Sequence, residues 1–184
     1  MEQSPDPISQ PDAYRASLLA TLGDEDVAVA LESGPAALRQ LIVESGALLR
    51  VRPEPTEWSV LECVGHMVDA ELVMSTRMRW IVSEDRPEIM GYDQDLWVEA
   101  IHHNDDDPEL LLALFEGLRH SNLDLWTRIP VEVHSRVGLH RERGPESYEM
   151  NVRLSAGHVR VHMAQARRGL ARLKAAQSAP GDQA

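Results

Sequence analysis

The chain has 184 residues and a mass of 20.6 kDa, which suffices for one domain with a substantial hydrophobic core. Its 18 basic and 30 acidic residues give a formal net charge of −12, which excludes the basic footprint of a protein that binds nucleic acid or an anionic membrane. The single cysteine, Cys63, excludes an intrachain disulfide framework and is typical of a reducing compartment. With no signal peptide at the start and no bilayer-long apolar run, we expect a cytoplasmic protein that acts on a small molecule.

The composition favours helices, because aromatic residues are few and Leu, Ala, Val, Glu and Arg are abundant. We expect one helical domain over residues 12–176. The polar segments outside it, residues 1–11 and 177–184, are predicted to be a flexible arm and a flexible tail.

Helix punctuation divides the first half of the chain into four segments. They cover about residues 12–22, 24–34, 35–52 and 57–83. Pro35 is predicted to begin the third helix, because proline fits a first helical turn, where its missing N–H removes no hydrogen bond. Thr56 or Ser59 is predicted to cap the fourth helix.

The second half of the chain contains one short and two long predicted helices. A loop rich in acids, with Pro87 and Gly91, precedes the short helix at about 96–102. Asp107-Pro108-Glu109 combines an N-cap, a first-turn proline and an early acid, which predicts a helix from there to about Arg128. Residues 131–144 are irregular by pattern, and no strand is predicted. Ser147 is predicted to cap a last helix that reaches about Ala176, so four long helices indicate an antiparallel bundle.

Two histidines lie at helical spacing in this last helix. His158 and His162 are four residues apart, so they share one face of the helix. The solvent-exposed face is marked by arginines at every seventh position, Arg153, Arg160 and Arg167. The two histidines and Gln165 point away from that face and therefore toward the core. There they are either metal ligands or a pair of hydrogen-bonded core histidines, and the spacing leaves both interpretations open.

A third histidine, His66, lies at the margin of the inward face of the 57–83 helix. Gly65 beside it would let another helix approach closely. Asp69 lies one turn later and could accept a hydrogen bond from the His66 imidazole, as carboxylates do at metal sites, or it could be a solvated acid.

The other reactive side chains are weaker candidates for a chemical role. Cys63 is expected to be a buried, inert thiol. His102, His103 and the acids of 105–107 are expected to be solvated, while His120 and His134 have no partner at ligand spacing. His140 is of more interest, because the loop before the last helix could fold over a metal. Trp58 is expected to pack in the core or to line a pocket.

Two sequence segments resemble signatures of one protein family. Trp58-Ser59…Gly65-His66…Asp69-Ala70-Glu71 resembles the first signature of the DinB-like superfamily of bacterial four-helix-bundle proteins. His158-x-x-x-His162 followed by Gln165 resembles the second signature, on the last helix of the family. The intervening Tyr92-Asp93-Gln94-Asp95-Leu96-Trp97 and His140…Gly144-Pro145 are also similar to family segments, so the resemblance spans about residues 35–173.

The resemblance implies an all-α, DinB-like bundle of up-down-down-up type, here with additional short N-terminal helices, and a three-histidine metal site. The implied ligands are His66, His158 and His162, with Asp69, Gln165, His140 and Trp58 as candidates for supporting or pocket residues. Val159 departs from the family pattern, in which an acid often follows the first histidine of the pair. Zinc is the expected ion, and nickel or iron would also suit three imidazoles.

The same resemblance implies a function and two alternatives. Characterised relatives include enzymes in which a metal-bound bacterial thiol attacks an electrophile, so we expect a thiol S-transferase that uses a bacillithiol- or mycothiol-type cosubstrate. The alternatives are a hydrolase that uses metal-activated water, and a non-enzymatic bundle with a structural histidine cluster. The resemblance also suggests stress-linked expression, and the sequence leaves open whether the chain forms a homodimer.

Overall fold

The computed structural model describes residues 5–178, so the outer parts of the predicted arm and tail lie outside the described residues. The helices are α1 (Pro11–Ala20), α2 (Val27–Ser45), α3 (Val60–Ser83), α4 (Gln94–Ile101), α5 (Pro108–Arg128) and α6 (Tyr148–Ser178). A small sheet contains β1 (Glu88–Ile89), β2 (Val137–His140) and β3 (Gly144–Ser147). Within residues 5–178, no helix combines the length and the apolar character that crossing a membrane requires.

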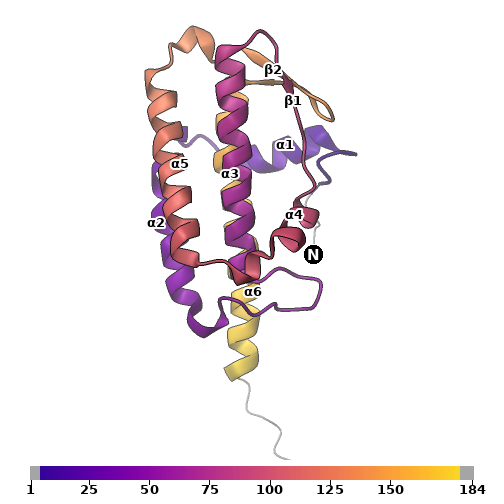
Figure 1. The fold of residues 1–184 in the computed structure, drawn as a ribbon, viewed down its shortest axis with the longest axis vertical. Helices are drawn as coiled ribbons and strands as arrows, with labels where there is room; N and C mark the ends of the chain where they lie inside the picture. The colour runs from indigo at the N-terminus through magenta and orange to yellow at the C-terminus, as the bar shows by residue number, and fades with distance from the viewer. Residues whose placement is uncertain (1–4, 179–184) are drawn as a thin grey trace, which may run out of the picture.

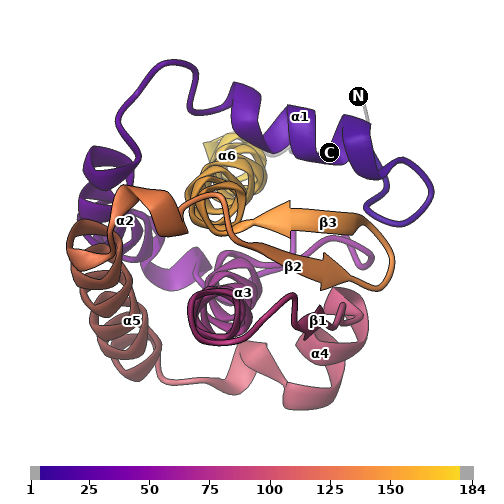
Figure 2. The same ribbon diagram turned by 90° about the horizontal axis from the view of Figure 1, so that it is seen from above.

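Helices α2, α3, α5 and α6 form a four-helix bundle (Figure 1). Helix α3 packs against α5 and α6, and α2 packs against the same two helices. In Figure 1, α2 runs downward, α3 and α5 run upward, and α6 runs downward. Viewed from the other end, this is the expected up-down-down-up topology. Seen from above, α1 crosses α6 and α4 lies beside α3, which leaves the bundle flanked on one side by short elements (Figure 2).

The caps predicted from the sequence begin three of the long helices. Ser59 and Glu62 form a reciprocal capping box at the start of α3. Asp107 accepts a hydrogen bond from the Glu109 N–H at the start of α5, and the Ser147 hydroxyl accepts one from the Met150 N–H in the first turn of α6. These bonds satisfy backbone donors that the first helical turn leaves without partners.

Two predictions about secondary structure are wrong. Pro35 does not begin a helix but lies inside α2, which runs without a break from Val27. Tertiary packing accounts for this, because Gly34 and Pro35 are buried and a Cβ added to Gly34 would lie 3.7 Å from the ring of Phe115. The second error is the sheet: β2 pairs with β3 in antiparallel register and with β1 in parallel register. Its strands are only two to four residues long, too short for an alternating pattern to emerge.

The bundle interior consists of two apolar clusters. One cluster includes Leu38, Leu61 and Phe115, and the other includes Leu31, Met78 and Tyr148. Buried polar side chains from α3, α5 and α6 contact one another in this interior, namely Glu71, Ser75, Arg119, Asn122 and Ser155. A buried polar layer of this kind requires internal hydrogen bonds, and it brings polar chemistry into the centre of the bundle.

Candidate metal centre

The three predicted histidines converge between α3 and α6. The Nε2 atom of His66 lies 3.1 Å from Nε2 of His158 and 3.2 Å from Nε2 of His162. All three ligand atoms lie within 4.8 Å of one another, and the side chains are at most 9% exposed. Helical spacing explains the arrangement, since α6 presents two histidines one turn apart to a single histidine on α3.

Burial keeps these imidazoles neutral at physiological pH. It lowers the pKa of His66 to about 2, with a further contribution from His162, and it lowers the pKa of His162 to about 4. The pKa of His158 also falls well below its usual range, because of burial first and the two neighbouring histidines second. A neutral imidazole is the form that binds a metal ion.

Gln165 and Trp58 hold the rings in place. The Nδ1–H of His162 donates to the side-chain oxygen of Gln165 at 2.9 Å, which leaves the Nε2 lone pair directed toward the other two histidines. The ring of Trp58 packs against His66 and His162, with distances between ring centroids of 5.0 Å and 6.0 Å. Both residues therefore contact the histidine cluster.

The donor set fits a divalent ion. Nitrogens bound to zinc at 2.0–2.1 Å in a tetrahedron lie about 3.3 Å apart, close to the spacings from His66 to its two neighbours. The Nδ1 atom of His158 has no hydrogen-bond partner among the described residues. Without an ion, the His66 Nε2–H would have to donate hydrogen bonds to its neighbours, which is the alternative of a hydrogen-bonded core.

Asp69 does not support His66. Its carboxylate oxygen lies 2.8 Å from Nε2 of His103, whose Nδ1 lies 2.6 Å from a carboxylate oxygen of Asp106. The prediction that His103 is solvated is therefore wrong, because this ring is buried against α3. The close approach at Gly65 is made by this ring and not by a helix: a Cβ on Gly65 would lie 2.3 Å from Cγ of His103.

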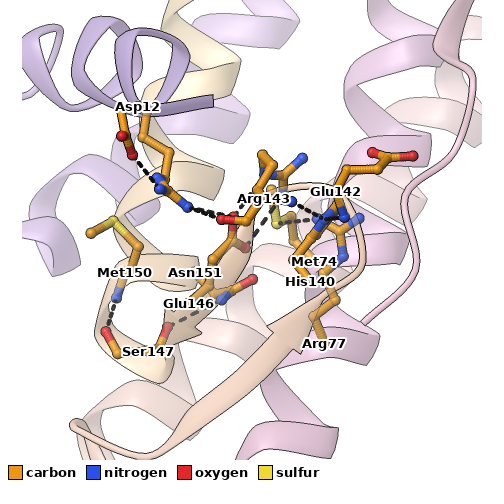
Figure 3. A network of polar contacts seen from close by, with 11 residues as sticks. Asp12, Met74, Arg77, His140, Glu142, Arg143, Glu146, Ser147, Met150 and Asn151 are labelled. Atoms are coloured by element: carbon orange, nitrogen blue, oxygen red, sulfur yellow. Dashed lines mark hydrogen bonds and ion pairs between the residues drawn. The ribbon is translucent and has the colours of Figure 1, made fainter. Parts of the chain in front are cut away.

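His140 lies at the end of β2 and belongs to the hairpin rather than to the histidine cluster. Its Nδ1 accepts hydrogen bonds from the backbone N–H groups of Glu142 and Arg143, at 3.2 and 3.3 Å. Figure 3 shows it beside Arg143, within the polar network around the β2–β3 turn. The turn that follows His140, and not His140 itself, reaches the neighbourhood of the metal centre.

A cavity of about 410 Å³ opens beside this centre. His158 lies in its wall, together with side chains from α1, α3, the segment before α4 and the β2–β3 turn, among them Tyr14, Ala70, Arg77, Tyr92 and Arg143. Its size is typical of a small-molecule site. A ligand in this cavity would thus contact one of the three histidines.

Sequence reasoning missed the buried ionic residues near the site. Glu71 and Arg119 form an ion pair at 3.0 Å, each with a side chain 1% exposed. Arg77 is buried in the cavity wall. The spacing of Arg77 from His66, eleven residues or about three turns on the same helix face, was an available signal.

The remaining candidates have structural roles. Cys63 is buried, as predicted, and burial raises the pKa of its thiol to about 12, which disfavours the reactive thiolate. His134 stacks on Trp126 with ring centroids 4.1 Å apart, and His120 is exposed on α5.

Known proteins resemble this chain in sequence. OB0782 and OB0413 of Oceanobacillus iheyensis, each named "putative metal-dependent hydrolase", are 27% identical over 107 residues and 26% identical over 108. Each match covers 58% of this chain and 62% or 61% of the relative. YfiT of Bacillus subtilis, which has the same descriptive name, is 30% identical over 89 residues, 48% of this chain and 50% of its own. The chain thus matches about half to three fifths of the length of these relatives.

The fold likewise has a solved counterpart. The structure of YfiT, described as "a probable metal-dependent hydrolase with an unusual four-helix bundle topology", matches with a TM-score of 0.73 at 21% identity over 89% of both chains. The family model of the DinB superfamily matches residues 30–166, which is most of the chain and includes all three histidines. The chain therefore belongs to the DinB superfamily.

Proposed function

We propose that this chain is a metal-dependent thiol S-transferase that joins a bacillithiol- or mycothiol-type thiol to small electrophiles. The observation that carries the proposal is the convergence of three neutral imidazole nitrogens beside a ligand-sized cavity. Held there, a divalent ion, zinc in our proposal with nickel and iron as alternatives, would supply the Lewis acidity that makes a thiol or water nucleophilic near neutral pH.

The surrounding residues prepare the site for such chemistry. Three neutral imidazoles leave the charge of a divalent ion uncompensated, which favours an anionic ligand such as a thiolate. Gln165 fixes the tautomer of His162, and Trp58 covers the rings of His66 and His162. His158 is the one ligand that lines the cavity, so the substrate would approach past it.

A hydrolase that activates water at the same histidines is the second candidate. The names of the three relatives favour it, since each describes a metal-dependent hydrolase. The two candidates differ in one requirement, because a hydrolase turns over without a thiol and an S-transferase does not.

The test is turnover of the zinc-loaded and nickel-loaded protein on a panel of electrophiles and esters, with and without a low-molecular-weight thiol. We expect thiol-dependent consumption of the electrophile that is lost in His162→Ala and retained in His120→Ala, which removes an exposed histidine of α5. Thiol-independent ester cleavage with the same histidine dependence would replace the transferase with the hydrolase. Activity that His162→Ala leaves unchanged would refute both candidates.

Three accompanying expectations stay predictions. They are a cytoplasmic location, a role in the stress response and assembly as a homodimer.

A further inference from the structure

One face of α3 leads from the candidate metal centre to a buried arginine. His66, Ala70, Val73 and Arg77 follow one another at spacings of four, three and four residues, and the last three line the cavity that reaches His158. Eleven residues of helix correspond to about 16 Å along the axis. Helical side chains lean toward the N-terminus, so the guanidinium of Arg77 leans back toward the histidines. Its contact with Met74, one turn earlier, agrees with this direction.

Arg77 has no carboxylate partner in the part of the chain that the structure describes. Its side chain is buried, with the residue 3% exposed, and it donates to the backbone carbonyl of Met90 at 2.5 Å and to the sulfur of Met74 at 3.7 Å. Its Nε–H has no acceptor among residues 5–178. A buried guanidinium is costly without a counter-ion, so this group is poised for an anion.

The neighbouring charges do not supply that anion. The buried carboxylate whose charge acts on Arg77 is Glu146, which already pairs with Arg143 at 2.7 Å and lies 3.7 Å from Arg15 (Figure 3). The guanidinium groups of Arg143 and Arg15 thus already neighbour this carboxylate. Burial, followed by the charge of Arg143, lowers the pKa of Arg77 to about 10. The acids of the cavity wall, namely Asp6, Asp93, Asp95 and Glu142, are exposed, so water screens their charges.

We propose that Arg77 binds a carboxylate group of the ligand and thereby directs the opposite, reacting end of that ligand toward His158. This inference rests on the proposed function, since it names the class of molecule that the cavity receives. The carboxylate belongs either to the thiol or to the electrophile. One guanidinium matches the charge and the shape of one carboxylate, so small organic acids are the preferred class.

The first experiment uses thiols of matched length. Cobalt-loaded protein is titrated with 3-mercaptopropionate and with the neutral 3-mercapto-1-propanol, and the sulfur-to-cobalt charge-transfer absorption reports binding. We expect the acid to bind more tightly than the alcohol. Arg77→Met should weaken binding of the acid about 10- to 100-fold, the loss of a charge-assisted hydrogen bond, and should leave the alcohol unchanged.

Two further variants serve as controls. Arg77→Lys keeps the positive charge and should retain part of the preference for the acid. Arg141→Met removes an exposed arginine that pairs with Glu88 outside the cavity wall, and it should behave like the unmodified protein. Circular dichroism verifies that each variant is folded. Equal losses in Arg141→Met and Arg77→Met would mean that overall charge, and not Arg77, attracts the acid, which overturns the proposal.

A second experiment needs neither metal nor thiol. Propionate and its neutral amide are compared for their effect on the melting temperature of metal-free protein. Stabilisation by propionate that is absent in Arg77→Met supports the carboxylate site even if thiol binding and turnover fail. In that case the carboxylate belongs to the electrophile and not to the thiol. The inference is overturned if propionate has no effect, or the same effect in Arg77→Met, and the protein also shows no preference for the acid thiol. That outcome leaves the proposed function standing.

Discussion

The buried ion pair between Glu71 and Arg119 allows a quantitative test of the structure around the site. We consider the changes Glu71→Met and Arg119→Met, alone and together. Both wild-type side chains are 1% exposed, and the pair bridges α3 and α5. The carboxylate also accepts hydrogen bonds from Ser155 at 2.8 Å and from Asn122 at 2.6 Å, so it ties α3 to α6 as well.

The magnitude follows from what each change leaves behind. Either single change strands one buried charge, which lowers the free energy of unfolding by about 3–5 kcal/mol. The double change removes both charges and leaves neutral donors without the Glu71 acceptor, namely the Ser155 hydroxyl and one N–H of Asn122, whose amide still donates to Ser75. The expected loss is about 1–3 kcal/mol. The double variant is therefore expected to be more stable than either single variant, with a coupling energy of several kcal/mol.

Urea unfolding of the four proteins measures this coupling. The matched control is the same cycle on Asp124 and Arg128, an exposed pair on α5, for which a coupling of about 0.3–0.5 kcal/mol is expected. Losses at Glu71 and Arg119 that simply add would show that the two side chains do not share a desolvated environment. The placement of these two side chains in a buried polar layer would then be wrong.

Three further predictions concern the immediate supports of the site. Gly65→Ala should lower the free energy of unfolding by about 1–3 kcal/mol, because the new methyl group meets the ring of His103, and His103→Ala should abolish that penalty in urea unfolding. Burial lowers the pKa of His103, but its bonds to Asp69 and Asp106 outweigh this and raise the pKa above its usual range. Its charged form therefore adds stability that is fully present below about pH 6.5 and is lost as the pH rises through the raised value. The stability difference between wild type and His103→Gln should shrink over that range, and a difference independent of pH would contradict the assignment. Gln165→Leu should weaken zinc binding about 10- to 100-fold in a chelator competition, since His162 loses its orienting partner, and unchanged affinity would show that Gln165 has no such role.

The sequence predicted those features that depend on local rules. Ser59, Asp107 and Ser147 cap their helices because capping requires only a side-chain acceptor within the first turn. Helical spacing placed His158 and His162 on one inward face, whereas their convergence with His66 was expected from the family resemblance.

Features that depend on distant contacts could not be predicted in the same way. Asp69 is one turn from His66, yet its partner is His103, which reaches α3 from the connection between α4 and α5. Pro35 carries a helix-start signal that tertiary packing overrides. The burial of Arg77 in a cavity wall, without a carboxylate partner among the described residues, depends on segments that are distant in the sequence.

Metal content tests the central claim most directly. Untagged protein is purified, reconstituted with zinc or nickel, dialysed and analysed for its elements, alongside His158→Ala and the control His120→Ala. We expect about one divalent ion per chain in the wild type and in His120→Ala, and none in His158→Ala, because two imidazoles cannot replace the three-nitrogen donor set. Wild-type protein that retains no ion after reconstitution, or a His158→Ala variant that retains it fully, would contradict the metal centre and leave the three rings as a hydrogen-bonded core.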